Sequence, residues 1–388
     1  MGIMKKIKTA FALSLCLLFA LMFVFSALYG SIMLVSKNFT SADAYTSAKA
    51  MCVMEASSGR VLYSKNQNAQ LPMASTTKIM TAITAIENCN DLDEKFEISP
   101  KAVGISGTSL YLRKGEAFSI RELLYGLMLI SGNDASVAIG ERIGGDINTF
   151  VEMMNTTASK IGATNSHFDN THGLDSKTHY TTAYDLALIT SYALDNDTFR
   201  EIVSTKNTKI INTDGKTRYL KNKNRLLNSL DGCIGVKTGF TDDAGRCLVS
   251  ACERDGMRLV SVVLNCGPMF EESAALLESG FKEYKMYDVT QGYDFNKFVK
   301  VENGRKEFVT VGTDGGYSYP LKASEVEKLT YIYKLPSILP SPVEKGKEIG
   351  EVKVYFGNDL LFSEKIYTME EVRGNTILEK LKDIFAGW

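Results

Sequence analysis

The chain has 388 residues, enough for two or three domains, and its 45% hydrophobic and 23% charged residues are typical of a folded protein. This composition excludes a disordered or collagen-like chain. The 44 basic and 45 acidic side chains leave a formal charge of -1, so nothing attracts the chain as a whole to a phosphate backbone, and nucleic acid is not an expected partner.

The beginning of the chain has the pattern of an export signal. Three lysines within the first eight residues precede an uncharged run from Thr9 to Ser36, and a small-x-small triplet offers a cleavage point after Ala44. We expect residues 1–44 to be a cleaved signal peptide. The alternative is a retained signal anchor, because the apolar run is long enough to cross a bilayer. Under the positive-inside rule both versions place the body of the protein outside the cytoplasm.

The first elements expected after the signal are two strands and three helices. The runs 50–55 and 61–64, separated by a Ser-Ser-Gly turn, predict paired strands. A helix is expected to begin at Ser75, since apolar residues then recur at three- and four-residue spacing. A capping-box pattern at Ser119 predicts a second helix, and a third is expected from Asp134.

Three apolar runs later in the chain predict an antiparallel meander. They cover residues 233–237, 248–251 and 259–265, and a helix rich in Ala, Leu and Phe is expected over 271–287. Helices therefore both precede and follow the strands. Residues 45–288 are expected to form an α/β sandwich of an antiparallel sheet with helices.

The last third of the sequence changes character. Short alternating runs split by Gly and Pro turns predict a small all-β domain over residues 289–370. Residues 371–388 form an amphipathic tail with an apolar stripe that ends at Trp388, the chain's one tryptophan. We expect this tail to be a helix in the membrane interface; packing on the β domain is the alternative, because its charges nearly cancel.

Six of the seven cysteines lie outside the export signal. An even number outside the cytoplasm is compatible with disulfides. Irregular spacing and apolar surroundings instead favour buried thiols. Cys247 and Cys252 have opposite parity in one predicted strand, so they are expected on opposite faces of the sheet.

Three short motifs carry candidate chemistry. Ser75 and Lys78 lie three residues apart at a helix start, which brings a hydroxyl and an amine within reach; a lysine that loses its proton there can activate the serine. This pattern alone is unspecific, because another Ser-x-x-Lys begins at Ser279. Ser-Gly-Asn at 131–133, between two helices, and Lys-Thr-Gly at 237–239, at a strand end, make the combination far more specific.

In this order the motifs resemble those of the penicillin-recognising serine acyl-transferases, and more closely the low-molecular-weight D-alanyl-D-alanine carboxypeptidases. The resemblance covers nearly the whole chain, with matching strings at residues 73–81, 131–135, 171–174, 179–185 and 235–241. It implies a penicillin-binding hydrolase of the cell envelope that removes the terminal D-alanine from peptidoglycan stem peptides and takes β-lactam antibiotics as inhibitors. It implies no cofactor and no metal.

The resemblance also implies roles for single residues. Ser75 would be the nucleophile, Lys78 its base, and Ser131 the donor of a proton to the departing amine. The substrate-binding residues would be Asn133, Lys237, Thr238 and Gly239. The backbone N–H groups of Ser75 and Phe240 would hold the oxyanion. At the position of Tyr184 some members of the family carry an arginine. Whether this residue contacts the substrate therefore stays an open question.

A neutral Lys78 requires a lowered pKa, which burial and the cation of Lys237 would both favour. The alternative is a charged Lys78 that only orients Asn133. Two other activities also stay open: a β-lactamase, although no segment between Asn133 and Lys237 supplies a matching deacylating carboxylate, and a β-lactam sensor or wall-binding module that acylates once without turnover.

Two other types of site are not expected. The three histidines, His167, His172 and His179, have spacings of five and seven that match no helical pair of zinc ligands. A Ser-His-Asp triad lacks the Gly-x-Ser-x-Gly nucleophile elbow before these histidines.

Overall fold

The computed structural model describes residues 46–289, 297–313 and 315–376. The expected signal or anchor, residues 1–44, lies outside this range, as does the tail from residue 377 onward. Among the described residues, no helix combines the length and the apolar character needed to cross a bilayer.

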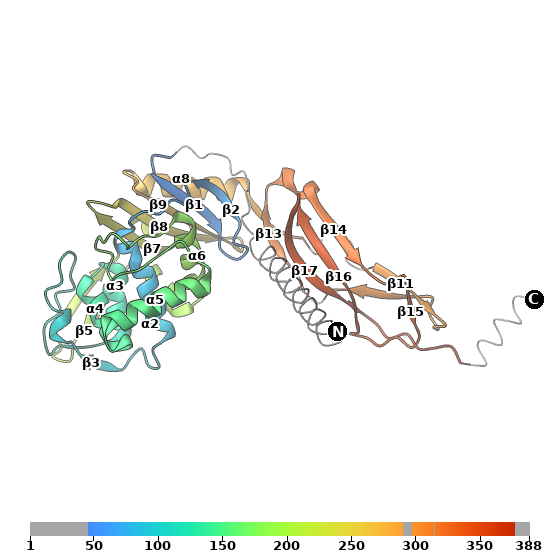
Figure 1. The fold of residues 1–388 in the computed structure, drawn as a ribbon, viewed down its shortest axis with the longest axis horizontal. Helices are drawn as coiled ribbons and strands as arrows, with labels where there is room; N and C mark the ends of the chain where they lie inside the picture. The colour runs from blue at the N-terminus through green and yellow to red at the C-terminus, as the bar shows by residue number, and fades with distance from the viewer. Residues whose placement is uncertain (1–45, 290–296, 314, 377–388) are drawn as a thin grey trace, which may run out of the picture. The chain divides into compact units, whose positions relative to one another are not determined.

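An antiparallel five-stranded sheet organises the α/β domain, in the order β2-β1-β9-β8-β7 (Figure 1). Its strands are β1 (Ala50–Glu55), β2 (Val61–Lys65), β7 (Cys233–Thr241), β8 (Gly245–Arg254) and β9 (Met257–Leu264). The predicted meander β7-β8-β9 is confirmed. The first hairpin joins it through the pairing of β1 with β9, in which Ala50 lies opposite Leu264.

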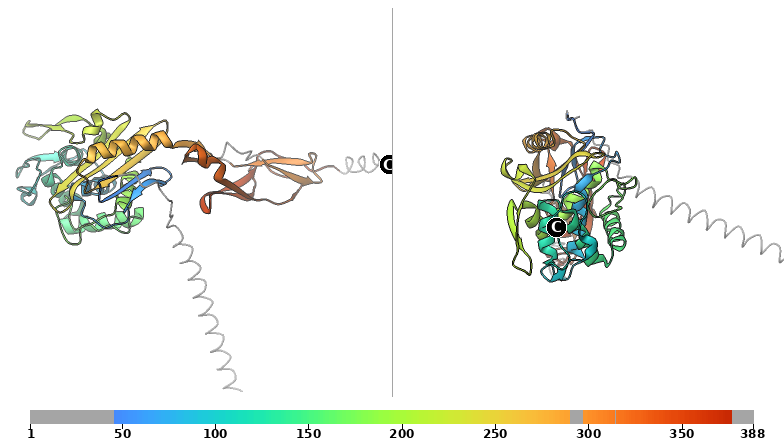
Figure 2. Two further views of the ribbon diagram at one scale, coloured as in Figure 1. Left: turned by 90° about the horizontal axis from the view of Figure 1, so that it is seen from above. Right: turned by 90° about the vertical axis from the view of Figure 1, so that its left-hand side faces the viewer.

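Helices cover both faces of this sheet (Figures 1 and 2). α8 (Met269–Glu283) packs on one face, with Leu277 against a cluster that includes Cys252 of β8. The other helices are α2 (Lys78–Glu87), α3 (Ile120–Leu129), α4 (Asn133–Gly144), α5 (Ile147–Ile161), α6 (Ala183–Leu194) and α7 (Asp197–Ser204). Cys247 belongs to the core on their side of the sheet. The two cysteines thus face opposite sides, as their parity predicts.

Shorter elements, which are not predicted from the sequence pattern, complete the α/β domain. Two hairpins pair β3 (Lys95–Glu97) with β4 (Ala117–Ser119), and β5 (Asn207–Ile211) with β6 (Thr217–Lys221). The 3-10 turns are η1 (Ala74–Thr77), η2 (Pro100–Ala102) and η3 (Arg225–Asn228). The capping box that precedes α3 is confirmed: the Glu122 N–H donates to Ser119 Oγ at 3.2 Å, and the Ser119 N–H donates to the Glu122 carboxylate at 2.9 Å.

The prediction of a helix as far as residue 287 is wrong at its end. α8 stops at Glu283, Tyr284 takes an extended conformation, and β10 (Lys285–Asp288) follows. β10 pairs with β13 (Ser318–Leu321), a strand of the β-rich region. Hydrogen bonding to this distant partner decides the local conformation and outweighs the helical pattern of the sequence.

The C-terminal region is β-rich, as predicted. Its six-stranded sheet has the order β14-β16-β17-β12-β11-β15. The strands are β11 (Lys297–Glu302), β12 (Phe308–Gly312), β14 (Leu329–Lys334), β15 (Ile338–Pro340), β16 (Glu348–Phe356) and β17 (Asp359–Thr368), and the turn η4 (Ala323–Lys328) precedes β14. Alternate residues such as Val352 and Val354 point into a separate apolar core.

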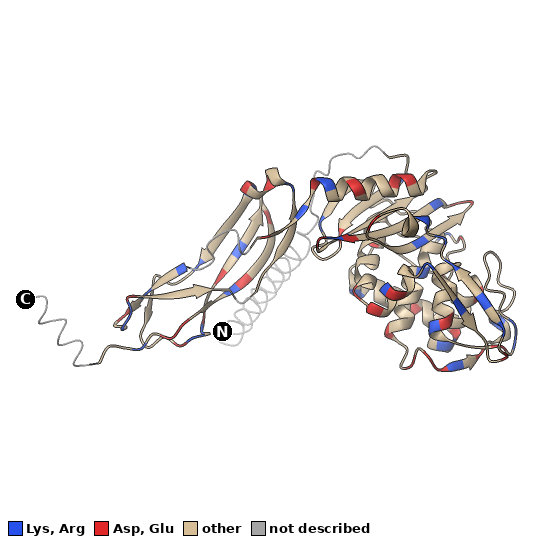
Figure 3. Cartoon of the chain, turned by 180° about the vertical axis from the view of Figure 1, so that it is seen from behind, with Lys and Arg blue, Asp and Glu red and all other residues tan. Residues whose placement is uncertain are grey.

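Charged residues of both signs are interspersed over the α/β domain and the β-rich region (Figure 3), in keeping with the formal charge of -1. The six cysteines in the described part of the chain are free thiols. Four of them are buried, and Cys89 and Cys233 are half-buried. This agrees with the interpretation of the cysteines as buried thiols rather than a disulfide framework.

Candidate active site

Ser75 lies in the tight turn η1, immediately before α2. The sequence placed it on the first turn of an α-helix; the structure puts it in a 3-10 turn, and Lys78 is the first residue of α2. Ala74, just before Ser75, has a positive φ of 49°, a conformation that costs a non-glycine residue energy and occurs at functional sites. Ser75 is half-buried, so a substrate can reach its hydroxyl.

β7 runs close against this turn at Gly239. A Cβ atom at Gly239 would lie 3.1 Å from the backbone nitrogen of Ser75 and 3.1 Å from the carbonyl oxygen of Met73. Only a residue without a side chain fits such an approach without displacing its neighbours. Glycine in the Lys-Thr-Gly motif therefore lets the strand and the turn form the two sides of one site.

Lys78 is fully buried, and its amine has three polar neighbours. Nζ donates to Asn133 Oδ1 at 2.7 Å and to the backbone oxygen of His172 at 2.6 Å, and it lies 3.1 Å from Ser75 Oγ. The first two oxygens can only accept hydrogen bonds. A neutral amine would use its two hydrogens on them, and its lone pair would then face the Ser75 hydroxyl. The packing thus orients Lys78 as a base.

The surroundings also favour the neutral form of this amine. Burial lowers the pKa of Lys78 well below its ordinary value, and the cations of Lys237 and Lys223 lower it further, against a smaller opposing effect of Asp134. Lys237 is itself buried and donates to the backbone oxygen of Thr238 at 2.8 Å. Burial, with a contribution from Lys223, lowers the pKa of Lys237 to about 7.

The second Ser-x-x-Lys string has none of these features. Ser279 is half-buried on α8, and Lys282 is exposed on the same helix. An exposed lysine lacks the burial and the fixed polar partners that orient the Lys78 amine toward Ser75. Burial therefore distinguishes the two matches that the sequence pattern left equal.

Ser131 and Asn133 lie at the corner between α3 and α4. Ser131 is buried and has a positive φ of 69°. The Asn133 side chain is fixed at both ends, since Oδ1 accepts from Lys78 and Nδ2 donates to the backbone oxygen of Ser106 at 2.6 Å. This second contact determines which end of the amide faces Lys78, because only the oxygen can accept from the amine.

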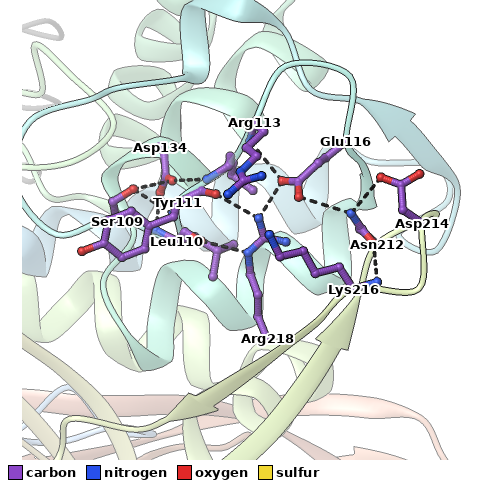
Figure 4. Close-up of polar contacts among 11 residues, drawn as sticks. Ser109, Leu110, Tyr111, Arg113, Glu116, Asp134, Asn212, Asp214, Lys216 and Arg218 are labelled. Carbon is purple, nitrogen blue, oxygen red and sulfur yellow. Dashed lines mark hydrogen bonds and ion pairs between the residues drawn. The ribbon is translucent and has the colours of Figure 1, made fainter.

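Asp134, next to Asn133, clamps the loop that crosses this corner (Figure 4). Its carboxylate accepts from the N–H of Leu110 at 2.8 Å, the N–H of Leu112 at 3.0 Å and Ser109 Oγ at 2.6 Å. Charge-assisted bonds of this type are among the strongest in proteins. From the sequence, Asp134 is predicted only as the start of a helix; in the structure its buried carboxylate also supports the site.

A buried ion pair holds the other side of the same loop (Figure 4). Arg218 of β6 contacts the Glu116 carboxylate at 2.6 Å and donates to the backbone oxygens of Leu110 at 3.0 Å and Tyr111 at 2.9 Å. Tyr111 has a positive φ of 58°. The hairpin β5-β6 thus braces the loop that carries the partners of Asn133 and Asp134.

The structure therefore brings Ser75, Lys78 and Asn133 into direct contact, with Gly239 packed against the nucleophile turn and Lys237 close enough to act on Lys78. The half-buried Thr238 follows Lys237 on β7, and the exposed Phe240 follows Gly239. Residues 46–289, 297–313 and 315–376 contain no group of three His, Cys, Asp or Glu side chains placed to hold a metal ion.

Comparison with known proteins supports one family. Residues 37–267 match the family described as D-alanyl-D-alanine carboxypeptidase, and residues 281–373 match the C-terminal domain of penicillin-binding protein 5. The chain is 30% identical over 349 residues to D-alanyl-D-alanine carboxypeptidase DacF of Bacillus subtilis, covering 88% of this chain and 90% of that one. It is 32% identical to DacC of Escherichia coli, covering 84% of each chain.

Solved structures agree. Penicillin-binding protein 5 of Haemophilus influenzae superposes with a TM-score of 0.70 at 26% identity, over 85% of this chain and 98% of that one. The Streptomyces K15 DD-transpeptidase gives a TM-score of 0.59 at 34% identity, over 62% of this chain and 99% of that one. The fold is thus the mixed α/β fold of the penicillin-binding proteins with a β-rich C-terminal domain. The chain belongs to the D-alanyl-D-alanine carboxypeptidase family.

Proposed function

We propose that Ser75 is the nucleophile with which this serine-type D-alanyl-D-alanine carboxypeptidase removes the terminal D-alanine from peptidoglycan stem peptides. The observation that carries the assignment is the buried amine of Lys78, which lies 3.1 Å from Ser75 Oγ. Two oxygens accept hydrogen bonds from this amine, so that its lone pair can face the Ser75 hydroxyl. A lysine with a lowered pKa in this position can take the serine proton.

In the first half-reaction Ser75 Oγ attacks the carbonyl carbon between the two D-alanines while Lys78 takes the hydroxyl proton. The resulting oxyanion lies between the N–H groups of Ser75 and Phe240. The C–N bond then breaks as Ser131 relays to the departing amine the proton that Lys78 took, which returns Lys78 to its neutral form and Ser131 to its hydroxyl. Free D-alanine leaves, and the stem peptide stays as an ester on Ser75.

Binding and turnover use the remaining motif residues. Asn133 binds both the substrate amide and the Lys78 amine. Lys237, Thr238 and Gly239 form the site for the terminal carboxylate. Water then hydrolyses the ester. β-Lactams acylate the same serine, which makes them inhibitors. The family favours this carboxypeptidase over the two alternatives, a β-lactamase and a sensor without turnover.

The direct test of the proposed function is release of D-alanine from a synthetic acyl-D-Ala-D-Ala peptide. We expect multiple turnovers, with an acyl-enzyme detected by mass spectrometry at the peptide that contains Ser75. Stoichiometric acylation without turnover would instead identify a sensor. Faster hydrolysis of penicillin than of the peptide would identify a β-lactamase.

A neutral replacement of Lys237 tests carboxylate recognition. Lys237→Gln should lower kcat/KM for the free-acid peptide by about a hundredfold, because a buried carboxylate loses its charged partner. The same peptide with an amidated C-terminus should lose much less. Equal losses for both peptides would place carboxylate recognition elsewhere.

The pH profile provides a second measurement on the same residue. Lys78 must lose a proton to act, so kcat/KM should rise with pH on the acid side. Lys237 must keep its proton to bind a carboxylate, so kcat/KM for the free-acid peptide should fall as pH rises through about 7. This alkaline decrease should be absent with the amidated peptide and in Lys237→Gln. A decrease that persists in both would belong to another group.

We also propose that the enzyme works on the outer face of the cytoplasmic membrane, where its substrate is. The pattern of residues 1–44 supports export, and the amphipathic pattern of residues 371–388 supports attachment through the tail. Burial of six large apolar residues at roughly 25 cal/mol per Å² would supply several kcal/mol, enough for reversible binding.

Deleting residues 376–388 tests this attachment. We expect the truncated enzyme to appear in the soluble fraction with unchanged peptide hydrolysis, measured after fractionation of cells. If it stays with the membrane and N-terminal sequencing shows an uncleaved signal, the N-terminal segment is the anchor. A lower melting temperature of the truncated protein would show instead that the tail packs on the β-rich domain.

A further inference from the structure

His179 is a buried side chain with two polar contacts, one on each ring nitrogen. It is 2% exposed, the N–H of Asp169 donates to Nδ1 at 3.0 Å, and Nε2 lies 2.8 Å from Thr77 Oγ1. A nitrogen that accepts cannot carry the ring proton, so in the neutral imidazole the proton is on Nε2. Burial lowers the pKa of His179 to about 4, which agrees with a neutral ring at pH 7.

The hydroxyl of Thr77 continues this chain of hydrogen bonds. It accepts from His179 Nε2 and donates its one hydrogen to the backbone oxygen of Ala74 at 2.8 Å. The three hydrogen bonds therefore all donate in the same direction: from the Asp169 N–H to the His179 ring, from the ring to the Thr77 hydroxyl, and from this hydroxyl to the Ala74 carbonyl oxygen. Hydrogen bonds arranged in one direction polarise and strengthen each other.

The oxygen at the end of this chain belongs to the Ala74–Ser75 peptide group. This peptide bond is trans and planar, so the position of the Ala74 oxygen determines where the N–H of Ser75 points. Gly173 touches the same oxygen from another side, since a Cβ atom there would come within 1.9 Å of it. The plane of this peptide is therefore held at a residue whose positive φ of 49° is otherwise unfavourable.

We propose that His179 is a positioning residue: through Thr77 it fixes the plane of the Ala74–Ser75 peptide and so aims the Ser75 N–H at the oxyanion. The inference rests on the proposed function, in which this N–H is one of the two oxyanion donors. A purely structural role is the competing explanation, because the ring also packs edge-on against Phe168, with centroids 5.9 Å apart.

Two amide replacements separate these roles. In His179→Gln the side-chain nitrogen reaches the place of Nε2 and can still donate to Thr77. In His179→Asn the side chain is one methylene shorter and reaches only the place of Nδ1. Thr77→Val removes the hydroxyl at similar size. His167→Asn is the matched control, on a half-exposed histidine of the same loop.

The enzyme with its full chain is assayed for acylation by penicillin and for D-alanine release. His179→Asn and Thr77→Val should each lower the acylation rate and kcat by about tenfold to a hundredfold with little change in KM, because a misdirected oxyanion donor acts on the transition state. His179→Gln should stay within about threefold of the wild type, as should His167→Asn. The double variant Thr77→Val/His179→Asn should be no slower than the slower single variant.

A boronic acid analogue of the peptide provides a readout of the oxyanion site itself, since its tetrahedral adduct places an oxygen there. Its affinity should fall in His179→Asn and Thr77→Val and be retained in His179→Gln. If the glutamine and asparagine variants lose the same affinity for the analogue, and their melting temperatures fall together with it, His179 has only a packing role. If the wild type is not acylated by penicillin, the proposed function fails; if it is acylated and His179→Asn reacts equally fast, this inference alone fails.

Discussion

Replacing Ser75 with alanine is expected to abolish both covalent labelling by penicillin and release of D-alanine. The variant should keep the fold, because Ser75 is half-buried and its hydroxyl has no side-chain hydrogen bond other than that with Lys78 among the described residues. Loss of a nucleophile costs at least about 10⁴-fold in kcat, since no other group forms the ester. Mass spectrometry of the intact protein after incubation with penicillin measures the adduct.

Ser279→Ala is the matched control for this experiment. It removes a hydroxyl from the second Ser-x-x-Lys string, on a helix that packs on the opposite face of the sheet. It should be labelled as completely as the wild type. Equal labelling of the wild type and both variants would show that Ser75 is not the nucleophile, and loss of the label in Ser279→Ala would place the nucleophile on α8.

Lys78→Arg is expected to lose acylation, although arginine is also a basic residue. A guanidinium cannot lose its proton in a protein, so it cannot take the proton of Ser75. General-base catalysis contributes about 10²- to 10⁴-fold, and we expect a loss in this range for the acylation rate constant. Arginine can still donate to Asn133 Oδ1 and to the His172 oxygen, the two acceptors of the Lys78 amine.

The control for this variant is its fold. Circular dichroism and thermal melting should show a cooperative transition in Lys78→Arg, so that a loss of activity can be assigned to the base. Near-native acylation at pH 7 would identify Lys78 as a charged residue that only orients Asn133. That result would leave Ser75 without a base among its contacts.

Much of the site can be predicted from the sequence because its residues come in short motifs with local geometry. A serine and a lysine three positions apart at a helix start meet in almost any fold. The motif at 131–133 marks a corner between helices, whereas 237–239, expected at the end of a strand, lies inside β7, which continues to Thr241. The conjunction of the three motifs in order, rather than any single one, identifies the family.

The supports of the site could not be predicted in the same way, because their partners are far apart in the sequence. The carboxylate of Asp134 acts on residues 109–112, and the His179 ring acts on Thr77. Nothing local distinguishes these side chains from an ordinary helix-start aspartate or loop histidine. The order of the motifs favours Ser75 over Ser279 already in the sequence, but the burial of Lys78 and the exposure of Lys282 are determined only by the assembled fold.

The pairing of β1 with β9 has a consequence for how the polypeptide acquires its structure. β1 lies inside the sheet, between β2 and β9, and residue 50 is hydrogen-bonded opposite residue 264. Closing so long a loop is slow, and the central pairing cannot form before β9 has been synthesised. The emerging chain therefore stays without its main sheet until most of the α/β domain has left the ribosome. An unfolded chain of this kind is the form that can be threaded through a narrow channel.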